Sequence, residues 1–336
     1  MTKLRVGLIG AGRIGKVHAE AITSQVAEAE IVRVVDVMLG SAEALGKQYG
    51  IPYSDNPRDI LDDETIDAVL ICSSTDTHSQ FIIDSAEAGK HIFCEKPIDH
   101  DLARIDAALT AVDKAGVKML VGFNRRFDDN FAKVQEVVAN GGVGDPHILR
   151  ITSRDPAPPP VEYIKVSGGI FLDMMIHDFD MARFLIGSEV EEVYTLGAVM
   201  VDPAIGEAGD VDTAIVTLKF ANGVIGSIDN SRQAVYGYDQ RVEVFGSKGM
   251  VDVKNNLPNT HTIYNADGVT SEKPLHFFLE RYMAAYGNEM KVFVDCVVND
   301  KPSPVNGQDG RAPVVIGMAA QKSLEEGRLV KISEIS

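Results

Sequence analysis

The sequence predicts an α/β domain with a doubly wound parallel sheet, followed by an α+β domain with a large, mostly antiparallel sheet. Two observations carry this prediction. In the first 122 residues, short apolar runs of the buried-strand type alternate with segments of helical periodicity. After residue 140 most segments have the pattern of strands, several joined by short turns such as Ala221-Asn222-Gly223 that favour antiparallel hairpins. We therefore expect two domains, residues 1–122 and 123–336.

A glycine-rich turn follows the first predicted strand. The apolar run of residues 4–9 leads directly into a GxGxxG sequence, and a helical pattern continues to Ile22. Between a strand and a helix, this spacing permits a tight turn and a close approach of the backbone to a pyrophosphate, whose charge the helix N-terminus favours. A dinucleotide is therefore favoured over a simple tight turn, and residues 1–122 are expected to form a Rossmann domain. The predicted cofactor contacts in this turn are Gly10, Gly12, Arg13, Ile14 and Gly15.

The second predicted strand, residues 29–35, ends at Asp36. This is the place where a Rossmann unit puts the acid that binds the adenosine ribose. A carboxylate there accepts from the 2′-hydroxyl and repels a 2′-phosphate, so NAD is predicted rather than NADP. An acid that merely ends a strand is the alternative, and Arg13 and Arg33 leave room for use of both cofactors.

Two further predicted strands deliver polar residues to the same edge of the sheet. Residues 68–72 are followed by Ser73, Thr75 and His78, and residues 91–94 by Glu95 and Lys96. Ligands of open α/β sheets bind beyond the carboxyl ends of the strands, so these five residues are candidate cofactor contacts. Helix capping is the other role open to Thr75 or Thr77. Because Pro97 fixes the backbone after it, Lys96 is a candidate for an ammonium directed at the reacting atoms.

The remaining periodic segments complete the two domains. In the first, helices are expected over 41–49, 57–61, 77–88 and 102–114, with a last strand over 117–121. In the second, helical patterns cover 128–140, 275–298 and 310–326. Its strands are expected over 147–153, 190–200, 212–220, 224–230, 240–245 and 250–253.

Residues 168–183, GGIFLDMMIHDFDMAR, contain the candidate catalytic pair. Asp173 and His177 are four residues apart, so on a helix their side chains share one face. The carboxylate can fix the tautomer of the imidazole and stabilise its protonated form, as removal of a proton from an alcohol near neutral pH requires. Taken alone, such a pair is more often solvated or locally hydrogen-bonded, so the prediction depends on the rest of the chain.

The bulk composition excludes several classes of function. A net charge of −17 and a pI near 4.9 argue against a nucleic-acid partner, because such binding neutralises phosphates with Lys and Arg. The three cysteines have no metal or disulfide spacing and are expected to be reduced and buried in a cytoplasmic protein. No signal peptide or membrane span is expected. No metal is predicted either, because no second histidine lies at ligand spacing from His177.

The motifs together resemble the Gfo/Idh/MocA family of NAD(P)-dependent sugar and polyol oxidoreductases. The resemblance covers essentially the whole chain and is greatest to the inositol 2-dehydrogenases of that family. Many relatives have Thr-Pro where this chain has Thr75-Asp76, which affects the cofactor loop but not the chemistry. The segments that carry the resemblance are the glycine turn, Asp36, Glu95-Lys96-Pro97, residues 122–128, residues 153–158, residues 168–183 and residues 236–241.

The resemblance implies oxidation of myo-inositol to 2-keto-myo-inositol (scyllo-inosose) with NAD, in inositol catabolism. It implies a catalytic set of Lys96, Asp173 and His177, with His177 as general base. A homotetramer is expected from the resemblance and from a sheet face left uncovered by helices. The implied substrate contacts are Lys96, Arg126, Asp155, Asp173, His177 and Tyr236.

Two alternatives remain open. One is a dehydrogenase of the same type that acts on scyllo-inositol or on another sugar or polyol. The other is an NAD-binding sensor without turnover, against which the presence of Lys96, Asp173 and His177 argues, because a sensor would not need all three. The sequence fixes neither the preferred isomer nor the physiological direction.

Overall fold

The computed structural model describes residues 3–335, which form two compact units. The first comprises residues up to 127 and residues 283–314, and the second comprises 128–282 and the residues from 315 onward. This differs from the single boundary predicted after residue 122, because the chain returns to the first unit near its C-terminus. The strands and helices predicted outside residues 168–183 are all present, with boundaries within three residues of those expected.

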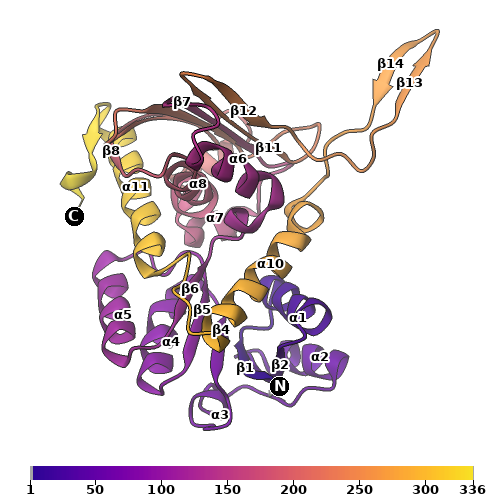
Figure 1. Ribbon diagram of the computed structural model, residues 1–336, viewed down its shortest axis with the longest axis vertical. Helices are drawn as coiled ribbons and strands as arrows, with labels where there is room; N and C mark the ends of the chain where they lie inside the picture. Colours follow the sequence, from indigo (N-terminus) through magenta and orange to yellow (C-terminus); the bar gives the residue numbers. More distant parts are fainter. Residues whose placement is uncertain (1–2, 336) are drawn as a thin grey trace. The chain divides into compact units, whose positions relative to one another are not determined.

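The first unit contains a six-stranded parallel sheet in the order β3-β2-β1-β4-β5-β6 (Figure 1). This order confirms the doubly wound Rossmann domain. All four residues of the central strand β4 are fully buried, as expected for a parallel sheet with helices on both faces. The strands are β1 (Leu4–Ile9), β2 (Ala29–Val35), β3 (Tyr53–Ser54), β4 (Ala68–Ile71), β5 (His91–Glu95) and β6 (Met119–Gly122).

The helices of the first unit are α1 (Arg13–Gln25), α2 (Leu39–Tyr49), α3 (Arg58–Leu61), α4 (Thr75–Glu87), α5 (Leu102–Ala115) and the short η1 (Asn124–Phe127). Parts of α10 (Phe278–Val298) and α11 (Gly307–Glu326) also belong to it. Phe293 of α10 packs edge to face on Phe93 of β5, with ring centroids 5.9 Å apart. A Cβ on Gly307 would lie 2.2 Å from the Leu109 side chain. These contacts explain the revised boundary: periodicity shows that a helix has an apolar face but not which core that face covers.

The second unit contains a seven-stranded sheet in the order β12-β11-β7-β10-β9-β8-β15. Every neighbouring pair is antiparallel except β7 with β10, which confirms the mostly antiparallel sheet. A separate hairpin of β13 and β14 extends away from the sheet (Figure 1). The strands are β7 (Pro146–Arg154), β8 (Val190–Ala198), β9 (Thr213–Phe220), β10 (Ile225–Ser231), β11 (Asp239–Gly246), β12 (Gly249–Val253), β13 (Thr262–Asn265), β14 (Gly268–Ser271) and β15 (Val330–Lys331).

Helices cover one face of this sheet. Helix α8 packs on β7 and α6 on β11 and β12, and the alternation of buried and exposed residues along β9 shows that the opposite face is open. Among the described residues, no helix is long and apolar enough to cross a membrane. The helical segments are α6 (Asp129–Ala139), α7 (Val161–Ser167), the π-helix η2 (Ile170–Met174), α8 (Ile176–Ile186), α9 (Pro203–Glu207) and η3 (Ile332–Glu334).

Candidate functional site

The glycine turn between β1 and α1 is built by close packing. A Cβ on Gly10 would lie 2.5 Å from the backbone of Cys72, and one on Gly15 would lie 1.9 Å from the carbonyl oxygen of Gly10. A Cβ on Gly12 would meet no atom within 4 Å. Two of the glycines therefore let the strand and helix come together, while the third leaves the backbone accessible at the start of α1. An accessible backbone at a helix N-terminus fits a pyrophosphate.

Asp36 lies at the end of β2 and is joined to this turn. Its Oδ2 accepts from the Ala11 backbone N–H at 2.7 Å, and its Oδ1 accepts from that of Met38 at 2.8 Å. Both bonds orient the carboxylate at the sheet edge that carries the glycine turn. The geometry fits an acid that binds a ribose hydroxyl, since a carboxylate oxygen has a second lone pair available beyond these bonds.

The residues after β4 have roles within the protein. The Ser73 hydroxyl lies 2.7 Å from that of Thr77, and the N-cap of α4, Ser74, makes no side-chain capping bond. His78 is buried, with Nδ1 2.8 Å from the Pro97 carbonyl oxygen and Nε2 3.1 Å from that of Ser73. Burial lowers the pKa of His78, so the ring is neutral at pH 7 and donates to one of these oxygens at a time.

The end of β5 carries Glu95 and Lys96. Glu95 is buried and its Oε1 lies 2.6 Å from Nε2 of His18, which is completely buried on α1. Lys96 is partly exposed, and the Lys96–Pro97 peptide bond is cis. The contact between His18 and Glu95 was not predicted, because nothing in the spacing of residues 18 and 95 indicates that they meet.

In the second unit, residues 168–186 do not form the single regular helix on which the catalytic pair was placed. Asp173 belongs to the π-helix η2, His177 belongs to α8, and Met175 lies in the turn between them. Gly168 and Gly169 precede η2 with φ of +88° and +71°. Both residues are therefore helical as expected, but the α-helical spacing assumed between them is wrong, because the wider turn of η2 interrupts it.

Asp173 is surrounded by donors that the sequence did not indicate. Its Oδ1 accepts from the Tyr163 hydroxyl at 3.0 Å, and its Oδ2 lies 3.6 Å from NH1 of Arg232. Arg232 is 1% exposed, and its NH2 lies 3.6 Å from Asp210 Oδ2. Asp210 in turn accepts from the Ile170 backbone N–H at 3.1 Å, at the start of η2. A buried guanidinium thus lies between the two carboxylates and links η2 to the end of β10.

Sequence reasoning missed Arg232 and Tyr163 for a physical reason. Arg232 follows β10, and Tyr163 lies on the short helix α7, for which no helix was predicted. Nothing in their local patterns shows that the fold brings them to Asp173. Asp178, next to His177, is fully buried and accepts from Asn230 Nδ2 at 2.8 Å, which ties the first turn of α8 to β10.

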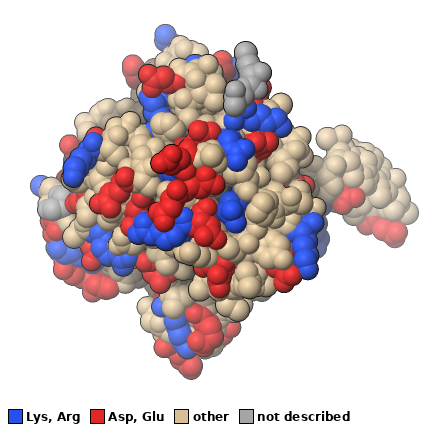
Figure 2. Space-filling view, turned by 90° about the horizontal axis from the view of Figure 1, so that it is seen from below, with Lys and Arg blue, Asp and Glu red and all other residues tan. Residues whose placement is uncertain are grey.

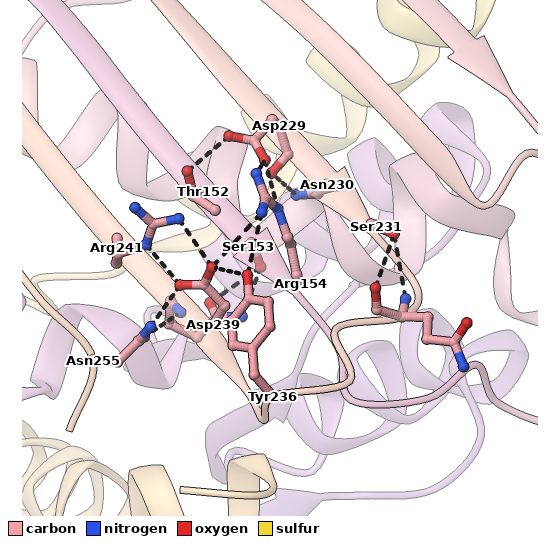
Figure 3. Close-up of polar contacts among 12 residues, drawn as sticks. Thr152, Ser153, Arg154, Asp229, Asn230, Ser231, Tyr236, Asp239, Arg241 and Asn255 are labelled. Atoms are coloured by element: carbon pink, nitrogen blue, oxygen red, sulfur yellow. Dashed lines mark hydrogen bonds and ion pairs between the residues drawn. The ribbon is translucent and has the colours of Figure 1, made fainter. Parts of the chain in front are cut away.

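Tyr236 lies in a polar network over β7, β10 and β11 (Figure 3). Its hydroxyl donates to Asp239 at 2.6 Å and accepts from Arg154 at 3.2 Å. Arg154 also binds Asp229, and Asp239 accepts from Arg241 at 2.7 Å. Burial raises the pKa of Tyr236, and its bond to Asp239 adds to the shift. The substrate contact predicted for Tyr236 remains a prediction, and its hydroxyl is bonded on both sides.

The other two predicted substrate contacts lie in different units. Arg126 is in the first unit, where its NH2 donates to Asp309 Oδ1 at 3.1 Å. Asp155 is in the second unit, where its backbone joins the end of β7 to Ser231 and Ala234. Both remain predictions.

The distribution of surface charge and the state of the cysteines can be compared with what the composition predicts. On the face shown in Figure 2, Lys and Arg side chains are scattered among Asp and Glu. All three cysteines are free and buried, as expected. Within residues 3–335 no group of three or more His, Cys, Asp or Glu side chains is arranged to hold a metal ion.

Comparisons with known proteins cover both units. Residues 4–123 match the model of the oxidoreductase family with an NAD-binding Rossmann fold, and residues 131–252 match the GFO/IDH/MocA C-terminal domain. The chain is 51% identical to myo-inositol 2-dehydrogenase of Thermotoga maritima over 99% of both chains. It is 48% identical to inositol 2-dehydrogenase of Rhizobium meliloti over 98% of this chain and 99% of that protein.

A solved structure extends the comparison to a bound state. Scyllo-inositol dehydrogenase from Lactobacillus casei, determined with NAD(H) and scyllo-inositol, has a TM-score of 0.92 to this structure at 29% identity. The match covers 99% of this chain and 100% of that one.

Proposed function

The chain belongs to the Gfo/Idh/MocA family of oxidoreductases, and we propose that it is an NAD-dependent inositol 2-dehydrogenase that oxidises myo-inositol to 2-keto-myo-inositol. The substrate class is supported by two inositol 2-dehydrogenases, which share 51% and 48% of their residues with this chain over nearly its full length. The similarity to a scyllo-inositol dehydrogenase keeps that isomer as the second candidate.

The observation that carries the choice of cofactor is Asp36. Its carboxylate is fixed by the Ala11 and Met38 backbone N–H groups beside an accessible glycine turn. A 2′-phosphate in that position would meet a carboxylate, whereas a 2′-hydroxyl can donate to it. NAD is therefore the cofactor, held by the turn at Gly10, Gly12, Arg13, Ile14 and Gly15 and by Asp36.

The catalytic roles follow from the chemistry of each group. When bound, NAD⁺ supplies the hydride acceptor for the carbinol carbon. His177 takes the hydroxyl proton as general base, and Asp173 stabilises the imidazolium. Tyr163 and Arg232 hold the Asp173 carboxylate oriented for this role. Lys96 donates a hydrogen bond to the reacting oxygen and stabilises its developing negative charge.

The proposal is tested by NADH formation, followed by absorbance, with NAD⁺ or NADP⁺ and a panel of myo-, scyllo- and chiro-inositol, glucose and xylose. Turnover of myo-inositol with NAD⁺ is expected. His177→Ala should lower kcat by about 10² to 10⁴-fold and leave NAD binding nearly intact. If only another polyol is oxidised, the protein is a dehydrogenase of the same type with that polyol as its substrate. NAD binding without any turnover would favour the alternative of an NAD-binding sensor. Loss of NAD binding in the His177 variant would mean that its role is misassigned.

We further propose that the protein is a cytoplasmic homotetramer with no nucleic-acid or membrane partner. Support comes from the open face of the second unit's sheet, where Tyr194, Leu196 and Ile215 are at least 36% exposed. Leu196 and Ile215 pair directly across β8 and β9, so they form a continuous apolar area. Light scattering after size exclusion should give four times the chain mass, and the double variant Leu196→Asp with Ile215→Asp should lower it. An unchanged mass in that variant would place the interface elsewhere.

A further inference from the structure

Two buried histidines bind the residues on either side of Lys96. Before it, Glu95 Oε1 lies 2.6 Å from Nε2 of His18 on α1. After it, the Pro97 carbonyl oxygen lies 2.8 Å from Nδ1 of His78 on α4. His18 and His78 are 0% and 2% exposed, so both contacts are shielded from water.

We propose that His18 and His78 are positioning residues that fix the backbone direction at Lys96 and so place its ammonium for catalysis. The inference rests on the proposed function, because it takes Lys96 as the group that binds the reacting oxygen. Lysine reaches its target through a flexible four-carbon stem, so a small rotation at its Cα becomes a large displacement at Nζ. A displacement of about 1 Å in a catalytic group can cost about 10²-fold in rate.

The packing around each histidine supports a directed role. The His18 ring meets the edges of Phe93 and Tyr286, with centroid distances of 4.8 and 5.5 Å, so it has one orientation toward Glu95. On the strand that follows, a Cβ on Gly122 would lie 3.2 Å from both Cα and Cδ of Glu95. The glycine therefore gives the Glu95 side chain the space it occupies beside β6.

The second anchor is reinforced by its neighbour. Ser79, next to His78 on α4, donates from its hydroxyl to Asp99 Oδ2 at 2.6 Å, and Asp99 also pairs with Arg104. Helix α4 thus holds the chain at Pro97 and again at Asp99, while α1 holds it at Glu95. Because α1 begins at the glycine turn, the His18 contact also links the pyrophosphate site to Lys96.

His18 faces Glu95 through Nε2, whereas His78 faces Pro97 through Nδ1 and turns Nε2 toward the Ser73 carbonyl oxygen. The neighbours of Lys96 are therefore contacted by different ring nitrogens, which gives the test its specificity. The amide nitrogen of Gln reaches about as far as Nε2 of His, and that of Asn about as far as Nδ1. At position 18, His18→Gln should therefore retain kcat within about threefold, and His18→Asn should lose about 10 to 10²-fold. At position 78 the order should reverse, with His78→Asn active and His78→Gln impaired. A role in general packing would not produce this crossed pattern.

Three measurements separate positioning from loss of fold or of cofactor. The dissociation constant for NADH should stay within threefold of the wild-type value in both His18 variants, and it should be the same in His78→Asn and His78→Gln. The deuterium isotope effect on kcat with C2-deuterated myo-inositol should rise in the impaired pair, because hydride transfer becomes more rate-limiting. His91→Gln is the matched control: this histidine lies at the other end of β5, where Nδ1 accepts from the Lys118 backbone N–H, and its kcat should be unchanged.

A readout independent of turnover is the reactivity of Lys96. Trace acetylation of the NADH-bound protein, quantified by mass spectrometry against the other lysines, should change at Lys96 in His18→Asn and His78→Gln but not in His91→Gln. If His18→Asn does not fold, Gly122→Ala tests the same anchor with both histidines intact and should show the same changes. Its Cβ would lie 3.0 Å from Cζ of Phe93, which packs on His18, and 3.2 Å from Cα and Cδ of Glu95.

The outcomes are distinct. Equal activity of Asn and Gln at each position, or unchanged Lys96 reactivity, would overturn the inference. If Lys96→Met retains wild-type turnover, or the wild-type protein oxidises no polyol, the proposed function fails instead, and the acetylation pattern still decides whether the histidines position the lysine.

Discussion

Replacing Gly169 by alanine should disturb both stability and catalysis. Gly169 has φ +71° and ψ −167°, a region that is open essentially to glycine alone, where another residue costs about 1–3 kcal/mol. An added Cβ would lie 2.8 Å from Oδ1 of Asp210, the atom that accepts from the Ile170 backbone N–H. Losing that charged hydrogen bond costs about 1.5–3 kcal/mol more. The expected loss in the free energy of unfolding is the sum, about 2.5–6 kcal/mol.

The displacement should also reach Asp173 and His177, the proposed catalytic pair. Asp210 lies 3.6 Å from Arg232, which lies 3.6 Å from Asp173. Moving Asp210 therefore shifts the cation that orients Asp173, and kcat should fall while NAD binding, a property of the first unit, stays unchanged. A loss of NAD affinity parallel to the loss of kcat would contradict this route.

Gly187→Ala is the matched control for the backbone term. Gly187 ends α8 in the same unit with φ +65°, and a Cβ there would meet no atom within 4 Å. In Gly187→Ala, only the left-handed backbone conformation should lower the free energy of unfolding, by about 1–2 kcal/mol. Urea unfolding followed by far-ultraviolet circular dichroism at fixed protein concentration compares the two variants. If Gly169→Ala is no less stable than Gly187→Ala, the contact with Asp210 has no energetic role and the reasoning is refuted.

Two further predictions concern the first unit. Asp36→Ser should lower kcat/KM for NAD⁺ by about 10-fold or more and reduce the preference for NAD⁺ over NADP⁺, because the variant removes both the acceptor for the ribose hydroxyl and the repulsion of a 2′-phosphate. Steady-state kinetics with each cofactor measures the ratio of the two kcat/KM values. An unchanged ratio would show that Asp36 does not determine the choice of cofactor. Burial raises the pKa of Glu289 above its ordinary value near 4.5, and the charge of Glu95 adds to the shift. The folded state then binds this proton more tightly than the unfolded state, so the contribution of Glu289 to stability is full below pH 4.5 and is lost as the pH rises toward the folded-state pKa. Glu289→Gln stays neutral, so the decline in the free energy of unfolding with rising pH should disappear when urea unfolding is measured from pH 4.5 upward. A decline as steep as that of the wild type would mean that other groups cause it.

The alternation of strands and helices and the glycine turn could be predicted from the sequence because their causes are local. The signals for the cofactor site all lie within the first 36 residues: the first strand, the GxGxxG turn after it, and Asp36 at the end of the second strand. Each signal depends only on residues close to it in the sequence. The buried cysteines and the hairpins of the second sheet are predictable for the same reason. The pairing of Asp173 with His177 was predicted from their spacing and stays a prediction, because Asp173 lies in the π-helix η2 and His177 in α8.

Tertiary structure alone decided the surroundings of these groups. Arg232 reaches Asp173 from 59 residues further along the chain, and His18 reaches Glu95 across 77 residues. Such contacts depend on which strands and helices pack together, and a periodic pattern shows only that a face is apolar. The return of α10 to the first unit has the same origin, because its aromatic face fits the core at Phe93. The sequence thus determined which chemical groups the proposed site contains, and the packing of distant segments determined which neighbours orient them.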